Sequence, residues 1–223
     1  YCPRCGTSLS SHELALGYKD NIEDPSVFVK FEQADEPGTF LLVWTTTPWT
    51  LPGNVALAVG ENIAYVKVEQ NGEKYILAKN RLGILEGDYK VLENLKTKNL
   101  EGRRYKPLYN FLQPGPKTHT VVIASFASSE EGTGIVHTAG MYGVEDFELC
   151  KKLGIKLNHL VNMKGEFMEE VEPFKGLFVK DADGKIIVDL TQKKLLYKSE
   201  KIKHTYPFCW RCDTPILYYA LDA

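Results

Sequence analysis

The sequence predicts an α+β protein that is mainly β, with a barrel-like body, a few peripheral helices and a small neck formed by both ends of the chain. Many short runs of β-branched and aromatic residues are separated by turn residues, whereas only two stretches have helical spacing. Matching Cys-x-x-Cys pairs also stand near the two ends of the chain. We expect residues 1–20 and 200–223 to form the neck and residues 21–199 to form the body.

The expected strands are rich in valine, isoleucine, phenylalanine and threonine. They cover residues 26–32, 40–46, 55–59, 120–126 and 134–139. Residues 64–69 and 74–78 alternate in polarity around Asn71-Gly72, which is the strongest short-range signal for a hairpin. A sheet is therefore expected to dominate the body.

Two helices are expected among these strands. Residues 143–153 have helical spacing and are followed by Gly154, a residue typical of helix ends. A second helix is expected over about residues 182–196, where Ile186, Ile187, Leu190 and Leu195 fall near helical spacing. Residues 198–204 then lead back towards the second cysteine pair.

Composition limits the possible functions. The chain has 223 residues, enough to bury a sizeable core, and no apolar run long enough to cross a membrane. The net charge of -2 argues against tight binding of duplex nucleic acid, although a single-stranded end can still be accepted by stacking and a few hydrogen bonds. The chain begins with Tyr1 and has no secretory signal, so we expect a fragment of a cytoplasmic protein. We also expect this protein to be a monomer.

Four of the five cysteines form the two terminal pairs, Cys2 with Cys5 and Cys209 with Cys212. Reduced thiols in this spacing favour a metal site over disulfides. Two such pairs supply the four thiolates of a structural zinc site, which leaves no open position for a substrate. The alternative is a set of free thiols or a redox pair.

The segment WTTTPWTLPGN, residues 44–54, brings several hydroxyl groups together at the end of an expected strand. Successive strand residues face opposite sides, so all three consecutive threonines can line one surface only if the strand distorts, as Pro48 and Pro52 encourage. The simple interpretation is a β-rich run of threonine ended by a turn. The alternative is a pocket lined by hydroxyl groups.

This segment resembles the threonine-rich motif of the editing domain (connective peptide 1) of isoleucyl-tRNA synthetases, which are class I aminoacyl-tRNA synthetases. EGTGIVHT, residues 131–138, resembles the second editing motif of that family, and HTYPFCWRCDTP, residues 204–215, resembles its zinc-binding return strand. The resemblance covers essentially the whole chain. Valyl and leucyl relatives usually carry arginine at the position of Thr47 and lack histidine at that of His137, which favours the isoleucyl family.

The resemblance implies a hydrolase that removes valine from mischarged tRNA, because a hydrophobic synthetic site rejects valine too weakly; this family is the standard example of such editing. Its partners would be the 3′ end of charged tRNA and the remainder of a parent synthetase. The chain contains no HIGH or KMSKS motif, so the ATP-dependent step would belong to that remainder. The alternatives are an editing domain of the valyl or leucyl type and a zinc-ribbon binding module without catalysis.

The resemblance also assigns roles to individual residues. Asp146 would bind the substrate ammonium, although an acidic residue in the first turn of a helix is favoured by the dipole in any case. His137 would exclude isoleucine from the pocket, whereas a lone histidine on an apolar strand face is more often a core residue. Water would be the attacking group, because no serine or cysteine with a matched histidine and acid stands out.

The remaining predicted site residues surround the ester. Hydroxyl and amide contacts to the ester, the ribose and the water would come from Thr45, Thr46, Thr47, Thr50 and Asn54. Further substrate contacts would come from Trp49, Gly132, Thr133 and Gly134. Trp49 would either stack on the terminal adenine or serve in packing. After the second motif, relatives usually continue with Ala-Pro, but residues 139–143 read AGMYG, which leaves the loop before Asp146 without its proline.

Overall fold

The computed structural model describes residues 1–113 and 115–221. Its strands are β1 (Tyr18–Glu32), β2 (Thr39–Thr45), β3 (Ala56–Val59), β4 (Ala64–Gln70), β5 (Glu73–Ala78), β6 (Lys90–Lys96), β7 (Thr120–Ile123), β8 (Ile135–Thr138) and β9 (Leu196–Pro207). Its helices are α1 (Ser11–Ala15), α2 (Thr97–Leu100), α3 (Val144–Leu153) and α4 (Val179–Gln192), with 3-10 helices η1 (Pro48–Gly53) and η2 (Lys79–Ile84). The described chain is therefore mainly β, as the sequence predicts.

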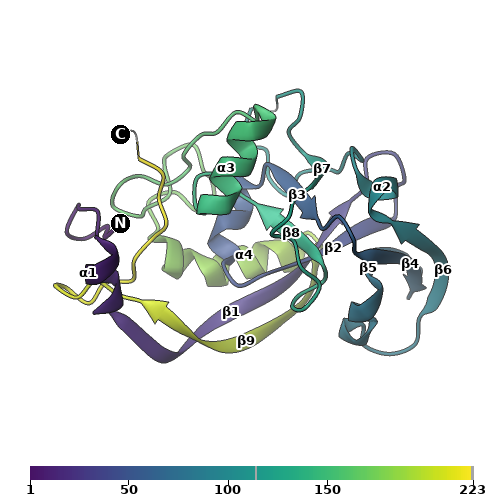
Figure 1. Ribbon diagram of the computed structural model, residues 1–223, viewed down its shortest axis with the longest axis horizontal. Helices are drawn as coiled ribbons and strands as arrows, with labels where there is room; N and C mark the ends of the chain where they lie inside the picture. The colour runs from purple at the N-terminus through teal and green to yellow at the C-terminus, as the bar shows by residue number, and fades with distance from the viewer. Residues whose placement is uncertain (114, 222–223) are drawn as a thin grey trace.

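The strands form one mixed sheet in the order β6-β4-β5-β2-β8-β3-β7, and β1 joins it through β2. β2 runs parallel to β5 and β8, whereas β3 runs antiparallel to β8 and parallel to β7. The sheet curves into a half-barrel (Figure 1). This arrangement places the end of β2 next to β8, although the two strands lie far apart in the sequence.

A long antiparallel ribbon of β1 and β9 connects the body to both ends of the chain. Its register runs from Tyr18 opposite Pro207 to Val29 opposite Leu196. Figure 1 shows that the ribbon carries the two ends to the same side of the molecule. The predicted boundary at residue 20 falls where the register of this ladder shifts, between Lys19 and Ile22, and the one at residue 200 falls within the paired part. Both boundaries stay a prediction, and residues 222 and 223 of the predicted neck lie outside the described residues.

Local sequence signals predict several elements well. The Asn-Gly hairpin is confirmed as β4 and β5, with Asn71 and Gly72 both at positive φ. Helix α3 ends at Gly154, whose φ of 68° is the left-handed cap that the sequence predicts.

Other bounds differ from the prediction. β7 ends at Ile123 instead of residue 126, because Ala127 donates to the carbonyl of Ala124 and closes a turn there. Helix α4 starts at Val179 and ends at Gln192 instead of spanning residues 182–196, since Lys194 takes a positive φ of 56° and ends the helical path. The strand expected over residues 26–32 is the C-terminal half of the much longer β1.

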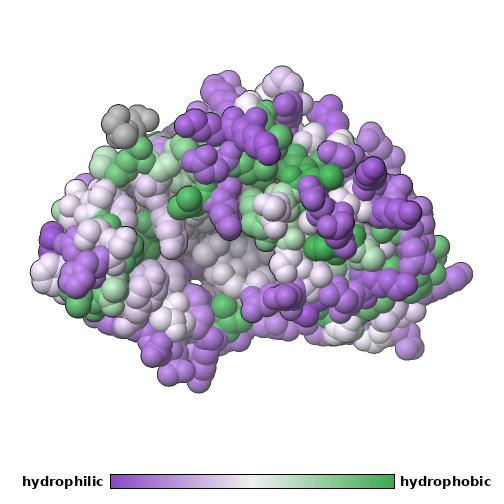
Figure 2. All heavy atoms as spheres, in the orientation of Figure 1, coloured by the Kyte–Doolittle hydropathy of each residue, from purple (hydrophilic) through white to green (hydrophobic). Residues whose placement is uncertain are grey.

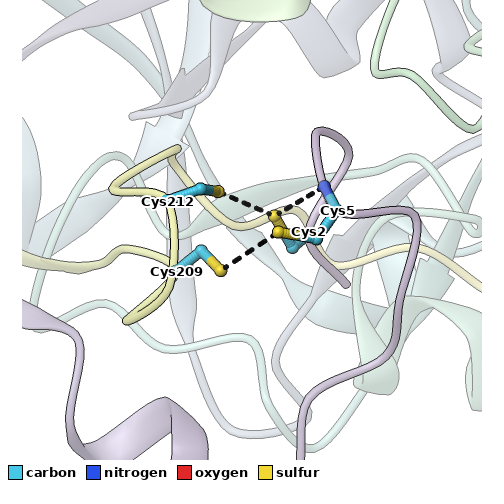
Figure 3. A group of neighbouring side chains, drawn as sticks. All are labelled: Cys2, Cys5, Cys209 and Cys212. Atoms are coloured by element: carbon cyan, nitrogen blue, oxygen red, sulfur yellow. Dashed lines mark hydrogen bonds between the residues drawn. The ribbon is translucent and has the colours of Figure 1, made fainter.

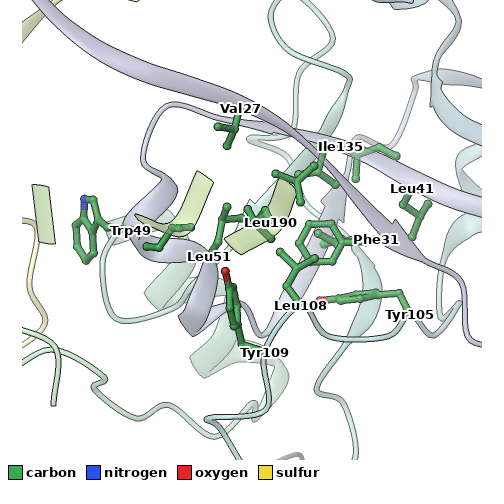
Figure 4. Packing of buried hydrophobic residues seen from close by; sticks show 14 of the residues in the cluster. Val27, Phe31, Leu41, Trp49, Leu51, Tyr105, Leu108, Tyr109, Ile135 and Leu190 are labelled. Atoms are coloured by element: carbon green, nitrogen blue, oxygen red, sulfur yellow. The ribbon is translucent and has the colours of Figure 1, made fainter. Parts of the chain in front are cut away.

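The main core lies between the concave side of the sheet and α4. Leu190 of α4 packs in one buried cluster with Phe31 of β1, Leu41 of β2 and Ile135 of β8 (Figure 4). Leu51 of η1 belongs to the same cluster. The segment after β2 is therefore anchored in the core. Within the described part of the chain, no helix is long and apolar enough to cross a membrane.

Candidate functional site

A pocket of about 580 Å³ opens where the end of β2 meets β8. Six of its lining residues are predicted site residues, namely Thr45, Thr46, Gly132, Thr133, Gly134 and His137. The lining also includes Trp44, Phe126, Ser128, Glu130, Glu131, Ile135 and Val136. Figure 2 shows a hollow near the middle of one face of the molecule, with hydrophilic side chains along much of its rim. The two sequence motifs therefore meet at one cavity.

The threonine segment leaves the strand conformation at its second threonine. β2 ends at Thr45, and Pro48 opens the 3-10 helix η1. The backbone N–H of Thr47 turns back to Thr45 Oγ1 at 3.2 Å. This distortion lets Thr45 and Thr46 both line the pocket, whereas Thr47 and Thr50 are not among its lining residues.

The hydroxyl groups of this segment are linked in a chain. Thr47 Oγ1 lies 3.2 Å from Thr45 Oγ1 and 3.3 Å from Thr50 Oγ1. Thr50 Oγ1 donates to the carbonyl of Thr47 at 2.8 Å, which closes the first turn of η1. The hydroxyl of Thr45, which lines the pocket, is thus connected through Thr47 to that of Thr50.

The linked hydroxyl groups end at His137. Its Nε2 lies 3.0 Å from Thr50 Oγ1, and its Nδ1 lies 2.8 Å from Asn54 Nδ2. Asn54 Nδ2 also donates to the carbonyl of Ala56, and Asn54 Oδ1 accepts from the Tyr105 hydroxyl at 2.6 Å. Since the asparagine nitrogen can only donate, Nδ1 of His137 is an acceptor and the ring proton lies on Nε2.

Burial keeps this imidazole neutral. His137 is 7% exposed, and the loss of solvation lowers the pKa of its side chain to about 4. Protonation at Nδ1 would also face the N–H of Asn54, which cannot accept it. Both nitrogens of His137 are hydrogen-bonded, so its ring is held in one orientation at the lining of the pocket.

Two glycines of the second motif are required by close packing. Gly132 has a φ of 58°, and a Cβ there would lie 2.7 Å from Cε3 of Trp44. Gly134 has a φ of 77°, and a Cβ there would lie 2.5 Å from Cβ of Ala78. Between them, the carbonyl of Thr133 accepts from the N–H of Ala78 at 2.8 Å. These residues hold the loop against β2 and β5, and so shape the pocket wall.

Asp146 lies in the first turn of α3, outside the lining of the pocket. Its Oδ2 accepts the backbone N–H of Ala139 at 2.9 Å, immediately after β8. Burial raises the pKa of this carboxyl, while the backbone hydrogen bonds from Ala139 and Gly140 act in the opposite direction. One oxygen of Asp146 therefore has a structural task at the end of the strand that carries His137.

The loop before Asp146 is ordered by contacts that replace its missing proline. The N–H of Met141 donates to the carbonyl of Ala139 at 2.7 Å, and the carbonyl of Met141 accepts from Ala220 at 3.0 Å. The hydroxyl of Tyr142 accepts from the N–H of Leu160 at 2.9 Å. The ring of Tyr142 also packs edge-on against Trp49, with centroids 4.9 Å apart. This loop is thus tied to the threonine segment.

The two tryptophans of the first motif have different environments. Trp49 is 4% exposed and belongs to the core, so of its two proposed roles packing is the one that its contacts display. Trp44 instead lines the pocket, although it is not among the predicted site residues. Strand alternation would have indicated it, because Trp44 and Thr46 are two residues apart on β2 and its extension.

Other residues of the site were also missed. Tyr105 holds Asn54 and stands 51 residues away from it. Asp183 of α4 accepts the backbone N–H of Trp49 at 2.8 Å from 134 residues away. No local pattern marks either residue, because both act through contacts that only the folded chain creates. Glu130 and Glu131 add exposed carboxylates to the rim of the pocket.

The four terminal cysteines form a separate cluster at the neck (Figure 3). Their sulfur atoms all lie within 4.8 Å of one another, with Cys2 and Cys212 at 3.5 Å and Cys5 and Cys209 at 3.9 Å. Four thiolates around one zinc ion at about 2.3 Å would stand about 3.8 Å apart. The cluster therefore fits a tetrahedral metal site, as the cysteine spacing predicts.

Comparison with known proteins shows what the chain is similar to. An isoleucine–tRNA ligase of Clostridium acetobutylicum is 52% identical over 223 residues, which is 100% of this chain, and one of Thermoplasma acidophilum is 48% identical over the same length. The chain is homologous to a segment of the isoleucine–tRNA ligases. It spans 21% and 22% of the length of these two relatives. No protein-family model matches the chain.

The family resemblance is thereby confirmed, and solved structures of editing domains share the fold. The crystal structure named GlLeuRS-CP1 superposes with a TM-score of 0.62 at 13% identity, covering 78% of this chain and 98% of that one. The Plasmodium falciparum cytosolic leucyl-tRNA synthetase editing domain gives a TM-score of 0.61 at 11% identity, covering 79% and 99%. This chain thus has the architecture of those leucyl domains.

Proposed function

We propose that this chain is an editing domain that hydrolyses the ester of valine mischarged onto isoleucine tRNA. The observation that carries the proposal is the position of His137, held between Thr50 and Asn54 at the wall of a pocket that Thr45 and Thr46 line. Such a pocket offers hydroxyl groups to an ester and a rigid boundary to its side chain. The 3′ end of charged tRNA would enter it, and charging with isoleucine would belong to the rest of a parent synthetase.

Selection against isoleucine would rest on His137. Its imidazole is fixed by two hydrogen bonds, so it cannot move aside without breaking its contacts with Asn54 Nδ2 and Thr50 Oγ1. A rigid wall of this kind admits a valine side chain and rejects one more methylene group. The neutral ring brings no charge to an apolar side chain.

The attacking group in this proposal is a water molecule. Thr45 lines the pocket and connects through Thr47 to Thr50, so the chain of hydroxyl groups supplies donors and acceptors that can orient a water and the ester oxygen. His137 does not serve as the general base, because Asn54 occupies its Nδ1 lone pair. The substrate's own vicinal hydroxyl would assist the water.

Asp146 would bind the substrate ammonium, although it lies outside the lining of the pocket. It follows β8, which carries His137, and the partial burial that raises its pKa would be offset by a neighbouring cation, which stabilises the charged form. For the neck we propose a structural zinc ion held by the four cysteines. The ion would join both ends of the ribbon and take no part in hydrolysis, since four thiolates leave no open coordination position.

The test is deacylation of Val-tRNA and Ile-tRNA by the chain and by Asp146→Ala. We expect Val-tRNA to be hydrolysed at least about tenfold faster than Ile-tRNA, in line with the discrimination that one methylene group provides. Asp146→Ala should lose this activity, whereas Glu145→Ala, an exposed carboxylate on the same turn, should retain it. Equal rates for both esters would contradict the proposed specificity.

The role of His137 is tested separately. His137→Ala should allow hydrolysis of Ile-tRNA. A folded His137→Ala variant that does not hydrolyse Ile-tRNA would contradict the proposal that this side chain excludes isoleucine. Thr-tRNA in parallel distinguishes an editing domain of another specificity. Absence of deacylation at high protein concentration would favour the non-catalytic binding module.

A further inference from the structure

We propose that Asp183, on α4 and outside the pocket, is a positioning residue that holds the threonine segment in its reactive conformation. This inference rests on the proposed function. Its basis is one contact: Asp183 Oδ1 accepts the backbone N–H of Trp49 at 2.8 Å. Trp49 lies inside the segment, between the hydroxyl groups of Thr47 and Thr50.

The contact satisfies a backbone group that η1 cannot satisfy itself. Pro48 opens this 3-10 helix and has no N–H, so Trp49 provides the first backbone donor of the helix. The next donor, from Thr50, already reaches the carbonyl of Thr47 at 3.0 Å. Thr47, which precedes the helix, supplies no side-chain cap to it. Asp183 therefore caps η1 from a distant part of the chain.

The side chain of Asp183 is buried and, within the described chain, forms no ion pair that competes with this hydrogen bond. The residue is 4% exposed and makes no ion pair with any described residue. The nearby charges are engaged with one another, since Asp24 of β1 binds Lys180 of α4 at 2.7 Å and His204 of β9 at 2.9 Å. A hydrogen bond from an N–H to a buried carboxylate is among the stronger ones in proteins. Burying the group without this bond would be costly.

The position of Trp49 is transmitted to the pocket through short contacts. The carbonyl of Thr47, one turn earlier, accepts the hydroxyl of Thr50, and that hydroxyl meets Nε2 of His137. Displacement of the first turn of η1 would therefore move both the hydroxyl chain and the wall of the pocket. Substrate entry would be affected less, because Asp183 does not line the cavity.

The experiment compares Asp183→Ala, Asp183→Asn and the control Asp181→Ala, an exposed carboxylate two residues away on the same helix. Single-turnover hydrolysis of Val-tRNA is measured as a function of enzyme concentration. Asp183→Ala should lower the maximal rate about tenfold or more with little change in the enzyme concentration for half-maximal rate, because the buried N–H of Trp49 loses its acceptor. Asp183→Asn keeps an acceptor oxygen and should stay within about threefold of the unmodified chain, as Asp181→Ala should.

A second measurement does not depend on activity. The amide resonance of Trp49 should be protected from solvent exchange in the unmodified chain and in Asp183→Asn, and should lose protection in Asp183→Ala while the β4–β5 hairpin amides keep theirs. If Asp183→Ala does not fold, the test rests on Asp183→Asn. A folded Asp183→Asn variant whose Trp49 amide has lost its protection from exchange overturns the proposal. Equal rates for the alanine variant and the unmodified chain also overturn it. If the unmodified chain hydrolyses no ester, the proposed function is wrong, and the Trp49 amide still tests the cap.

Discussion

Asn54 donates to Nδ1 of His137 across 2.8 Å, and this contact fixes the tautomer of the only histidine that lines the described pocket. The asparagine is itself held by Tyr105 and by the carbonyl of Ala56. Because Nδ1 must accept, Nε2 must donate to Thr50, and the hydroxyl chain of the threonine segment begins at a defined donor. The relationship makes His137 a part of the scaffold as well as of the pocket.

The first prediction concerns His137 and pH. Its folded-state pKa of about 4 lies below its ordinary value of 6.5, so the unfolded chain binds more protons between these values. The contribution of His137 to the free energy of unfolding should therefore fall by about 3 kcal/mol as pH decreases from 7 to 4. Urea unfolding should show this loss in the unmodified chain relative to His137→Gln. The exposed His12→Gln should follow the unmodified chain, and an identical pH dependence in all three would contradict the prediction.

The second prediction has the opposite sign. Burial raises the pKa of Asp183 to about 7 from its ordinary 3.8, so the folded chain binds more protons than the unfolded chain between these values. Ionised Asp183 therefore costs stability that increases as pH rises. Relative to the unmodified chain, Asp183→Asn should gain about 3 kcal/mol between pH 5 and pH 8. Chemical denaturation at several pH values measures the difference, and Asp181→Asn should show none of it.

The third prediction concerns the metal. The purified chain should carry about one zinc ion, and Cys209→Ser should lose it on dialysis against a chelator because three thiolates bind less tightly than four. Limited proteolysis should then cut the ends of β1 and β9 faster. Cys150→Ser is the matched control, since this cysteine is buried on α3 away from the cluster. Zinc content that is unchanged in Cys209→Ser would exclude the proposed site.

The fourth prediction separates backbone strain from steric conflict. Gly132→Ala places a Cβ 2.7 Å from the ring of Trp44 at a φ of 58°, so it should destabilise the chain and displace the pocket wall. The expected cost is about 3 kcal/mol, the sum of strain and overpacking. Gly72→Ala has a φ of 81° but meets no atom within 4 Å. Its cost should be about 1 kcal/mol, from strain alone. Equal costs in thermal unfolding would show that the contact with Trp44 is unimportant.

Features that depend on neighbours in the sequence were predicted well. Asn71-Gly72 indicates a hairpin because both residues accept positive φ, and Gly154 marks the end of α3 for the same reason. The prolines of the threonine segment indicate that its strand is interrupted, and β2 does end at Thr45. The bounds of β7 and α4 were less accurate, because single turns close them.

The order of the amino acids is enough to indicate the threonine segment, the cysteine spacing of the neck and the resemblance to isoleucyl editing domains. Which of these residues meet depends on the folded chain. The fold placed Trp44 in the pocket and Trp49 in the core, and brought Tyr105 and Asp183 to the threonine segment. The physical reason is that local propensity acts over a few residues, whereas the burial of a hydrogen-bonded polar group depends on strands and helices that are distant along the chain.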